Sequence, residues 1–507
     1  MSGPATDDAP IAVADSDAVD APGAQGDGVS PTVGGPPAVR PPRPLLGALA
    51  WCAAGAVALM SSGPLSDNSF LTHLATGRLL QERGLPSSNP FLFTGGDFPV
   101  PSWWFSGALA VAEDLGGGTA IRLLVVAVGA ALGVVLVALA RPERRDVAAR
   151  SSLPAVLVPV ALVIVTLAPF TTPRPHLVGF LLLGVALVLW RDDRSAWWMV
   201  PVFATWVNVH GTWLYGLGVL VLLTGCASLE RRRPVRILPV AAAALGVVIG
   251  GLLYPERLRL VVLPFEQFGD ERAREAISAY QEWAPAGWAH PLTWAVVLLG
   301  AAAVVALVRS RRWPSVVVAV LLVGLGMSAG RLLPVAAISL LPWASAAFAG
   351  TGPGLGSRRV AVPVRVGGVA LLLVAVAGAL RGPSYDLDRY PVAAVDWLEE
   401  RGLVADPDLR VVSHIDVGNY LVWRFGTEAN AFADDRPSVD AMLDHRSLDQ
   451  ARPDWALVLE RVDPDVVVFR DDKPLVPLLD GSGAWPRAAT IDGFAVYCAP
   501  RVRDRCG

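Results

Sequence analysis

The stretch TWVNVHGTWLYG, residues 205–216, decides how the most apolar part of the chain folds. It lies inside residues 197–229, a run of 33 residues without Asp, Glu, Lys or Arg. As one helix this run would extend about 50 Å, whereas the hydrocarbon core of a bilayer is about 30 Å thick. Asn208, His210 and Gly211 near its centre therefore predict two helices that meet at a turn.

The composition of the chain is typical of a membrane protein. Of its 507 residues, 53% are hydrophobic and 17% are charged, and the mean hydropathy is +0.48. Soluble domains average about 25% charged residues. The net charge of −3 is spread unevenly, since residues 1–44 carry −4, residues 45–381 carry +10 and residues 382–507 carry −9. This distribution predicts three parts.

Each of the three parts has its own expected structure. Residues 1–44 are rich in Pro, Gly, Ala and Asp and lack aromatic side chains. Because such a segment buries too little apolar surface to fold, we expect a disordered cytoplasmic tail. Residues 45–381 contain the apolar runs of a transmembrane domain. From residue 390 short elements alternate, which predicts a small α/β domain over 390–507.

Eleven apolar runs are candidates for membrane-spanning helices, which need roughly 20 residues each. The fold class that they predict is a polytopic α-helical membrane protein with about 11 spans. The runs are residues 45–62, 119–140, 153–170, 176–190, 197–209, 212–229, 237–253, 291–308, 314–330, 332–349 and 362–380.

Arginines predict how these spans are oriented in the plasma membrane. With the N-terminus in the cytoplasm, every short basic loop falls on the cytoplasmic side, as the positive-inside rule requires. If 197–229 were one span, the loop 230–236 would move outside, so the charges support the split independently. The loops 63–118 and 254–290 and the C-terminal domain are then expected outside the cell. The short basic loops hold 16 Arg and are residues 141–150, 191–194, 230–236, 309–312 and the loop with Arg358, Arg359 and Arg365.

The C-terminal part reads as alternating helices and strands. YPVAAVDWLEERG (390–402) predicts an amphipathic helix, and NYLVWRF (419–425) predicts a helix or a strand. Cys498 and Cys506 are able to pair if this end of the chain lies outside the cell. The expected strands are LRVVSH (409–414), NAFADD (430–435), DVVVFRDD (465–472) and the closing strand FAVYCA (494–499).

The first outside loop carries the two catalytic candidates, Asp67 and His73. A carboxylate at the membrane surface beside other polar groups is a candidate general base, and His73 follows Asp67 by six residues. The two side chains share a site only if a helix begins after Asp67. In that case a plain helix N-cap is the alternative role for Asp67. Residues 101–115 are amphipathic and are expected to lie along the interface, anchored by Trp103 and Trp104.

Basic and polar residues at the outer ends of the spans are candidates for substrate binding. Arg174 and His176 lie in PRPH, and Arg331 begins the tenth span from the same side. Their guanidinium groups suit a phosphate, and contact with lipid headgroups is the alternative. Asn208 and His210 either bind substrate or make structural hydrogen bonds at the helix break.

Charged residues after the predicted strands are weaker candidates. Asp434, Asp435 and Arg436 follow one strand, and carboxylates at strand ends commonly mark sites. We favour a solvated loop or a structural Asp–Arg pair, and more strongly so for Asp471 and Asp472. No spacing of His, Cys and Asp defines a metal site, so a divalent metal cofactor is left open.

Several of these segments together resemble bacterial polytopic membrane proteins of the GT-C glycosyltransferase type. The resemblance covers most of residues 45–500, and no single motif in it specifies a reaction. The matching pieces are Asp67, THLATGR, GLPSSNPFLFT, SWW, PRPH, WVNVHG and, in the C-terminal domain, YPVAAVDWL, DVGNYLVWRF and FADDRPS.

The resemblance implies transfer of a sugar from a polyprenyl-phosphate carrier to an envelope acceptor on the outer face. In such enzymes an acid in the first outside loop acts as a base or binds metal, and Asp67 matches that position. A second acid often stands beside it, where this chain has Asn68. The implied partners are membrane lipids and a polyprenyl-phosphate-linked sugar, without a nucleic acid; the oligomeric state is left open.

Two other functions remain open on the sequence. A non-catalytic membrane scaffold, whose C-terminal domain binds envelope partners, is favoured somewhat by Asn68 in place of the second acid. A transporter for lipid or solute predicts internal repeats and charged residues at the bilayer midplane. Neither feature is evident in the sequence.

Overall fold

The computed structural model describes residues 44–141, 152–192, 195–278, 283–352, 354–356, 358–436 and 438–507. The tail predicted over residues 1–44 lies outside these residues except for Pro44, and so does most of the loop 141–150. The disorder of that tail therefore stays a prediction.

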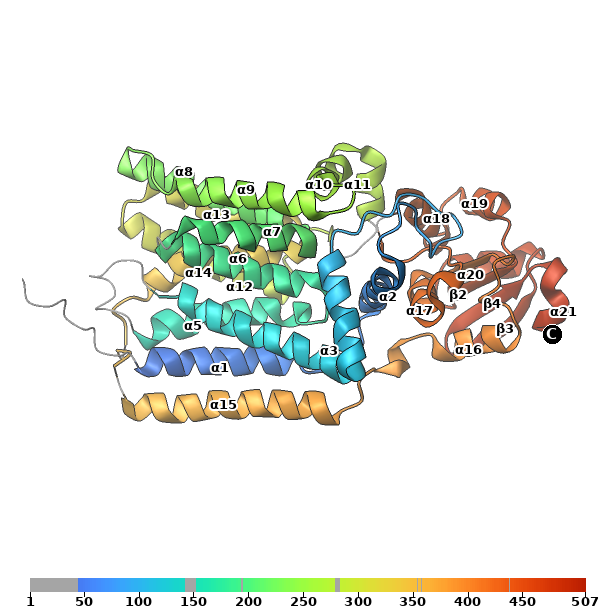
Figure 1. Cartoon of the computed structure of the whole chain (residues 1–507), viewed down its shortest axis with the longest axis horizontal. Helices are drawn as coiled ribbons and strands as arrows, with labels where there is room; N and C mark the ends of the chain where they lie inside the picture. Colours follow the sequence, from blue (N-terminus) through green and yellow to red (C-terminus); the bar gives the residue numbers. More distant parts are fainter. Residues whose placement is uncertain are drawn as a thin grey trace, which may run out of the picture. The chain divides into compact units, whose positions relative to one another are not determined.

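Each of the eleven predicted spans overlaps a helix in the described part of the chain (Figure 1). Of these helices, seven are long and apolar enough to cross a bilayer and three are shorter and apolar; the eleventh, at the predicted span 197–209, has only 11 residues. The protein is therefore a polytopic α-helical membrane protein, as predicted. The helices are α1 (Pro44–Met60), α3 (Trp103–Leu139), α5 (Leu153–Leu167), α6 (Pro175–Asp192), α7 (Met199–Val209), α8 (Trp213–Arg231), α9 (Ile237–Leu253), α12 (Pro291–Arg309), α13 (Trp313–Ser328), α14 (Leu333–Ala347) and α15 (Arg358–Arg381).

The run 197–229 is broken as predicted, since α7 ends at Val209 and α8 begins at Trp213. The turn between the two helices is fixed by the indole N–H of Trp206, which donates to Thr212 Oγ1 at 3.0 Å. Gly216 lies against the same indole, and a Cβ there would come within 2.3 Å of Cη2. The turn is thus a packed connection between two helices.

α3 contains a second break, at Gly116 and Gly117. Gly117 has φ +60°, a left-handed conformation that favours glycine. The break separates residues 103–115 from the span that follows, as predicted for the amphipathic segment, and Figure 1 shows the two parts at a steep angle. Trp103 does not project freely as a headgroup anchor, because its indole N–H donates to Asn208 Oδ1 at 2.7 Å.

The described parts of three basic loops that are predicted to be cytoplasmic lie together at one end of the helices. Arg191 donates to the carbonyls of Leu139 and Arg141 at 2.7 and 3.1 Å. Arg236 donates to the carbonyl of Arg191 at 3.1 Å. This grouping agrees with the positive-inside count, and the side of the membrane that this end faces stays a prediction.

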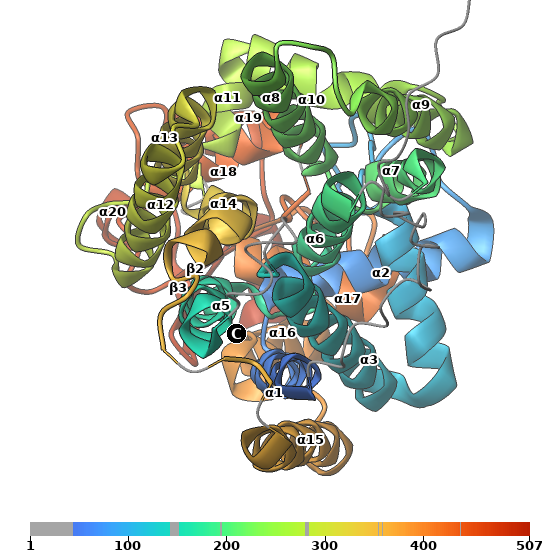
Figure 2. The same cartoon turned by 90° about the vertical axis from the view of Figure 1, so that its left-hand side faces the viewer.

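Arg122 in α3 holds the ends of α1 and α15 together. Its side chain is buried, with 2% of the residue exposed. A guanidinium satisfies carbonyl groups at the C-terminal ends of helices, where the last four have no intrahelical partner and the helix dipole is negative. Figure 2 shows α1 between α15 and α3. The five acceptors, at 2.8 to 3.1 Å, are the carbonyls of Ser62, Gly63, Gly378, Gly382 and Pro383.

The C-terminal part is an α/β domain with a four-stranded sheet of order β1-β2-β4-β3. β1 and β2 are parallel, and the pairs β2–β4 and β4–β3 are antiparallel. The strands are β1 (Val411–Ser413), β2 (Val466–Arg470), β3 (Arg487–Ile491) and β4 (Phe494–Cys498), and the helices are α16 (Val392–Glu400), α17 (Ile415–Phe425), α18 (Val439–Asp449), α19 (Trp455–Val462), α20 (Leu475–Ser482) and α21 (Arg503–Cys506).

One expected strand is wrong: NAFADD is not a strand, because only Ala431 in it makes a bridge. The sequence analysis did not predict β3, since this edge strand is mostly exposed and lacks an apolar run. FAVYC is a strand as predicted; it is β4, the last strand along the chain, and it lies fully buried inside the sheet. NYLVWRF is helical and forms the C-terminal part of α17. Cys498 and Cys506 form a disulfide.

The first outside loop is joined to the C-terminal domain. It contains α2 (Asn68–Arg83), which packs against α3 and α17. Leu92 and Val411 both bridge Ala431, so the loop continues the edge of the sheet. The loop 254–290 contains α10 (Arg259–Gly269) and α11 (Glu271–Ile277), and α11 packs against α18. The two loops predicted to lie outside therefore both contact the C-terminal domain.

Replacing Arg122 by Lys tests the role of the buried guanidinium. Lys has three donors, so at least two of the five carbonyls lose their hydrogen bonds, at about 1–3 kcal/mol for each unsatisfied buried group. We expect a clear fall in the thermal unfolding temperature of the detergent-solubilised protein. Arg231→Lys, at an exposed position, is the matched control and should leave it unchanged; equal stability of both variants would contradict this role.

Candidate functional site

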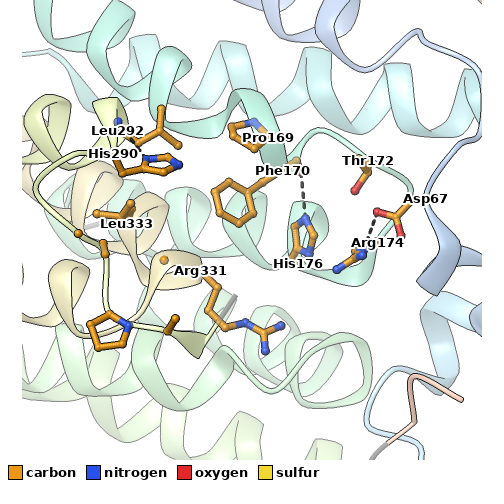
Figure 3. A pocket seen from close by; sticks show the side chains of 15 residues that line it. Asp67, Pro169, Phe170, Thr172, Arg174, His176, His290, Leu292, Arg331 and Leu333 are labelled. Carbon is orange, nitrogen blue, oxygen red and sulfur yellow. Dashed lines mark hydrogen bonds and ion pairs between the residues drawn. The ribbon is translucent and has the colours of Figure 1, made fainter. Parts of the chain in front are cut away.

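A cavity of about 480 Å³ opens where several helices begin. It is bordered by the first residues of α6, α12 and α14 and by the end of η1 (Ala168–Phe170). Figure 3 shows the Asp67–Arg174 pair, His176 and Arg331 around it, with His290 beyond Phe170. The lining residues are Asp67, Pro169, Phe170, Thr172, Arg174, His176, Ala284, Pro285, Ala286, Gly287, His290, Leu292, Gly330, Arg331 and Leu333.

Asp67 takes the N-cap role that the sequence left open beside that of a general base. It is the N-cap of α2, since Oδ1 accepts from the backbone N–H of Ser69 at 3.0 Å. Its Oδ2 accepts from Arg174 Nε at 2.6 Å, and the two side chains are 9% and 22% exposed. The helix does begin after Asp67, as a shared site with His73 requires. Asp67 is thus a cap and the acid of a shielded ion pair.

Two arginines bring positive charge to the cavity. Arg174 directly precedes α6, and Arg331 lies in η4 (Gly330–Leu332), directly before α14. The guanidinium of Arg331 lies 4.5 Å from the ring centre of Trp283. Helix N-termini carry partial positive charge and backbone N–H groups without intrahelical partners. The cavity therefore combines two cationic side chains with three helix N-termini, an arrangement that suits an anion.

His176 lines the cavity, whereas His210 lies behind it. Nε2 of His176 is 3.1 Å from the carbonyl oxygen of Phe170. The ring of His210 is 6.3 Å from that of His176, and its Nδ1 is 2.9 Å from Thr212 Oγ1. Residues 205–216 thus contact the site indirectly, because His210 in the turn between α7 and α8 packs near His176.

Asn208 makes structural hydrogen bonds and does not line the cavity. Its Nδ2 donates to the carbonyls of Ala204 and Gly250 at 2.8 and 2.9 Å, and its Oδ1 accepts from Trp103. The side chain is fully buried. The geometry therefore favours structural hydrogen bonds over substrate binding for Asn208, since these bonds connect α7 with α9 and α3.

His73 lies beside the site and faces α3. Its Nδ1 is 3.2 Å from Ser102 Oγ and 3.4 Å from Ser106 Oγ. Burial, followed by the positive charge of Arg174, lowers the pKa of His73 to about 4, so the ring is neutral near pH 7. His73 is not among the residues that line the cavity.

Asp435, a weaker candidate on the sequence, lies next to the Asp67–Arg174 pair. Its Oδ2 accepts a hydrogen bond from the hydroxyl of Ser69, and both Asp67 and Arg174 act on it electrostatically. The structural pair expected here is the neighbouring one, Asp434 with Arg436.

Asn68 joins the start of α2 to the C-terminal domain. It occupies the position of the second acid, and its Nδ2 donates to Asp416 Oδ1 at 2.7 Å. Two consecutive residues of α2, Asn68 and Ser69, therefore contact acids of the C-terminal domain.

His414, His445 and Asp449 form a group whose ligand atoms lie within 4.8 Å of one another. Lys473 Nζ, from the only lysine of the chain, lies 2.8 Å from Asp449 Oδ1. The backbone N–H of Ile415 donates to His445 Nε2 at 3.0 Å. An ammonium group and a backbone donor thus contact two of the three residues of this group, and at Asp67 a cation would compete with Arg174.

Comparison with known proteins gives similarities to solved structures and none to known sequence families. Neither a protein-family model nor a curated protein matches the sequence. The oligosaccharyltransferase of Archaeoglobus fulgidus, crystallised with a tethered acceptor peptide that contains the NVT sequon, aligns over 84% of this chain and 69% of its own. The sequence identity is 10% and the TM-score is 0.47. A match at this level says nothing about what this chain binds or does.

Substitutions at Asp67 separate its two roles. Asp67→Asn removes the charge of the ion pair and keeps an effective N-cap, whereas Asp67→Ala removes both. We expect Asp67→Ala to lower the free energy of unfolding by about 1 kcal/mol more than Asp67→Asn does. Chemical denaturation in detergent measures the difference. Asp97→Ala, at an exposed acid of the same loop, is the control, and equal effects of Asn and Ala would show that the cap contributes nothing.

Proposed function

We propose that this protein is an integral-membrane glycosyltransferase that moves a sugar from a polyprenyl-phosphate carrier to an acceptor on the outer face of the membrane. The observation that carries the proposal is the cavity that Arg174 and Arg331 line together with Asp67. Both arginines lie directly before a helix at the same end of the transmembrane domain.

A phosphate leaving group needs cationic stabilisation that is strongest in the transition state. Arg174 and Arg331 supply it, since negative charge grows on the phosphate oxygen as the bond to the sugar breaks. The helix N-termini of α6 and α14 add positive potential at the same place. Asp67 orients Arg174 through the 2.6 Å contact with Nε.

Apolar residues of the cavity suit the isoprenoid end of the carrier. Phe170, Leu292 and Leu333 belong to the lining, beside the charged groups. A volume of about 480 Å³ falls in the ordinary range of ligand sites, roughly 300–1,000 Å³. This combination of an anion-binding site with apolar walls fits a lipid phosphate better than a free nucleotide.

The geometry weighs against the other two functions. A transporter needs charged groups near the bilayer midplane, whereas Asp67, Arg174 and Arg331 all lie at helix ends. A scaffold has no need for an ion pair and a second arginine beside a cavity. The disulfide between Cys498 and Cys506 supports a C-terminal domain outside the cytoplasm, because disulfides persist in oxidising compartments.

Binding of polyprenyl monophosphate to the purified full-length protein tests the proposal. A hydrogen bond to a charged group contributes about 1.5–3 kcal/mol, so Arg174→Gln and Arg331→Gln should each raise the Kd roughly 10- to 100-fold. Arg272→Gln, at an exposed arginine outside the cavity, is the matched control. The wild type should also release polyprenyl phosphate from at least one polyprenyl-phosphate sugar when an acceptor is present.

Two results would contradict this function. One is a wild-type protein that binds uncharged polyprenol as tightly as the phosphate. The other is a wild-type affinity for polyprenyl phosphate that neither arginine variant reduces.

A further inference from the structure

The first turn of α2 brings an acid of the C-terminal domain to the ion pair at the cavity. Asp67, the N-cap, stands at the start of this turn and lines the cavity. Two residues later, the hydroxyl of Ser69 donates to Asp435 Oδ2. Asp67 and Arg174 act electrostatically on Asp435, but Asp435 does not line the cavity. It therefore lies next to the ion pair, outside the cavity lining.

The backbone around Asp435 is held firmly in place. The N–H of Asp435 donates to Asn419 Oδ1 at 2.9 Å. Arg436 bonds back to Asp434 and reaches Thr76 Oγ1 of α2 at 3.2 Å. The carbonyl oxygen of Ala433 lies so close to Gly418 that a Cβ there would be 1.9 Å away. Such support from neighbouring groups is what positions a reactive side chain.

The carboxylates of Asp67 and Asp435 have different surroundings. Both oxygens of Asp67 accept hydrogen bonds, one from Arg174 and one from Ser69 N–H. Burial raises the pKa of Asp435 to about 6, against the opposing effect of the Ser69 hydroxyl. A carboxylate with a pKa close to the working pH is the better general base.

We propose that Asp435, supplied by the C-terminal domain, is the catalytic base that takes the proton from the acceptor hydroxyl. This inference rests on the proposed glycosyl transfer and assigns one of its steps. It follows that the acceptor approaches from the side of the C-terminal domain and meets the donor sugar beside the Asp67–Arg174 pair.

The step balances without a further reactant. The acceptor oxygen gives its proton to the Asp435 carboxylate and forms a bond to the anomeric carbon of the sugar. The bond between that carbon and the phosphate oxygen breaks, and its electron pair stays on the phosphate, which Arg174 and Arg331 stabilise. Protonated Asp435 then releases its proton to solvent, and no group is oxidised or reduced.

The test compares Asp435→Asn with the wild type in full-length protein reconstituted in liposomes. Asn keeps an oxygen that accepts from Ser69, so the fold is expected to survive, with an unchanged unfolding temperature. The donor Kd, measured with polyprenyl monophosphate, should change less than twofold. Turnover of a polyprenyl-phosphate sugar should fall roughly 10²- to 10⁴-fold, the usual contribution of a general base. Asp471→Asn, at an exposed acid of the same domain, should change neither quantity.

The pH dependence gives a readout that a merely structural role would not move. Because Asp435 is protonated below about pH 6, the wild-type rate should fall as the pH drops through that value. This acidic limb should be absent from the residual rate of Asp435→Asn.

A hydrophobic carbodiimide, which reacts with protonated carboxyl groups shielded from water, tests the same acid without turnover. Peptide mass spectrometry should find the adduct on Asp435, with labelling that increases as the pH falls through about 6. An adduct on Asp67 alone, or none on either acid, would overturn the assignment.

The outcomes separate this inference from the proposed function. Normal turnover by Asp435→Asn, in a protein whose Arg331→Gln variant binds polyprenyl phosphate weakly, overturns the role of Asp435 alone. A wild-type protein that does not bind polyprenyl phosphate overturns the proposed function, and this inference with it.

Discussion

The ion pair between Asp67 and Arg174 joins two helix N-termini that would otherwise repel each other. Asp67 caps α2, and Arg174 stands directly before α6, so each residue lies where the backbone already carries partial positive charge. The carboxylate offsets that charge at α2 and fixes Arg174 Nε at 2.6 Å. One wall of the cavity, the direction of α2 and the contact of α2 with the C-terminal domain all depend on this pair.

Arg122 sets the frame in which that pair forms. Its five hydrogen bonds hold the residues after α1 and at the end of α15, which lead to Asp67 and to the C-terminal domain respectively. A buried guanidinium that binds carbonyls needs no acid partner, because the C-terminal ends of helices supply the negative potential. The two segments that bring Asp67 and Asp435 together thus leave the transmembrane domain from one anchored place.

Much of the transmembrane fold could be predicted from the sequence because the signals are local. Apolar length marks each span, and the arginine count alone required a break near Gly211, which the structure has between Val209 and Trp213. The cap at Asp67 was also foreseeable, since capping depends on residues two or three positions away. β3 was missed because an exposed edge strand leaves no apolar pattern.

The site itself depends on long-range pairing, which a single sequence does not reveal. Asn208 was recognised as a polar residue in an apolar run, but its partner Trp103 lies 105 positions away. Asp435 and Ser69 are 366 positions apart, so nothing near FADDRPS marks the acid as part of the same site as Asp67. Arg174, His176 and Arg331 were chosen for their place at span ends, and they do line one cavity with Asp67.

Photo-crosslinking tests most directly whether this cavity holds a lipid phosphate. A polyprenyl phosphate with a diazirine on the isoprene unit next to the phosphate would be irradiated with the purified protein, and the adducts mapped by mass spectrometry. The account predicts adducts at Phe170, Leu292 or Leu333, which line the cavity, and their loss when unlabelled polyprenyl phosphate competes. Adducts confined to the exposed faces of helices such as α9 and α15, without competition, would contradict it.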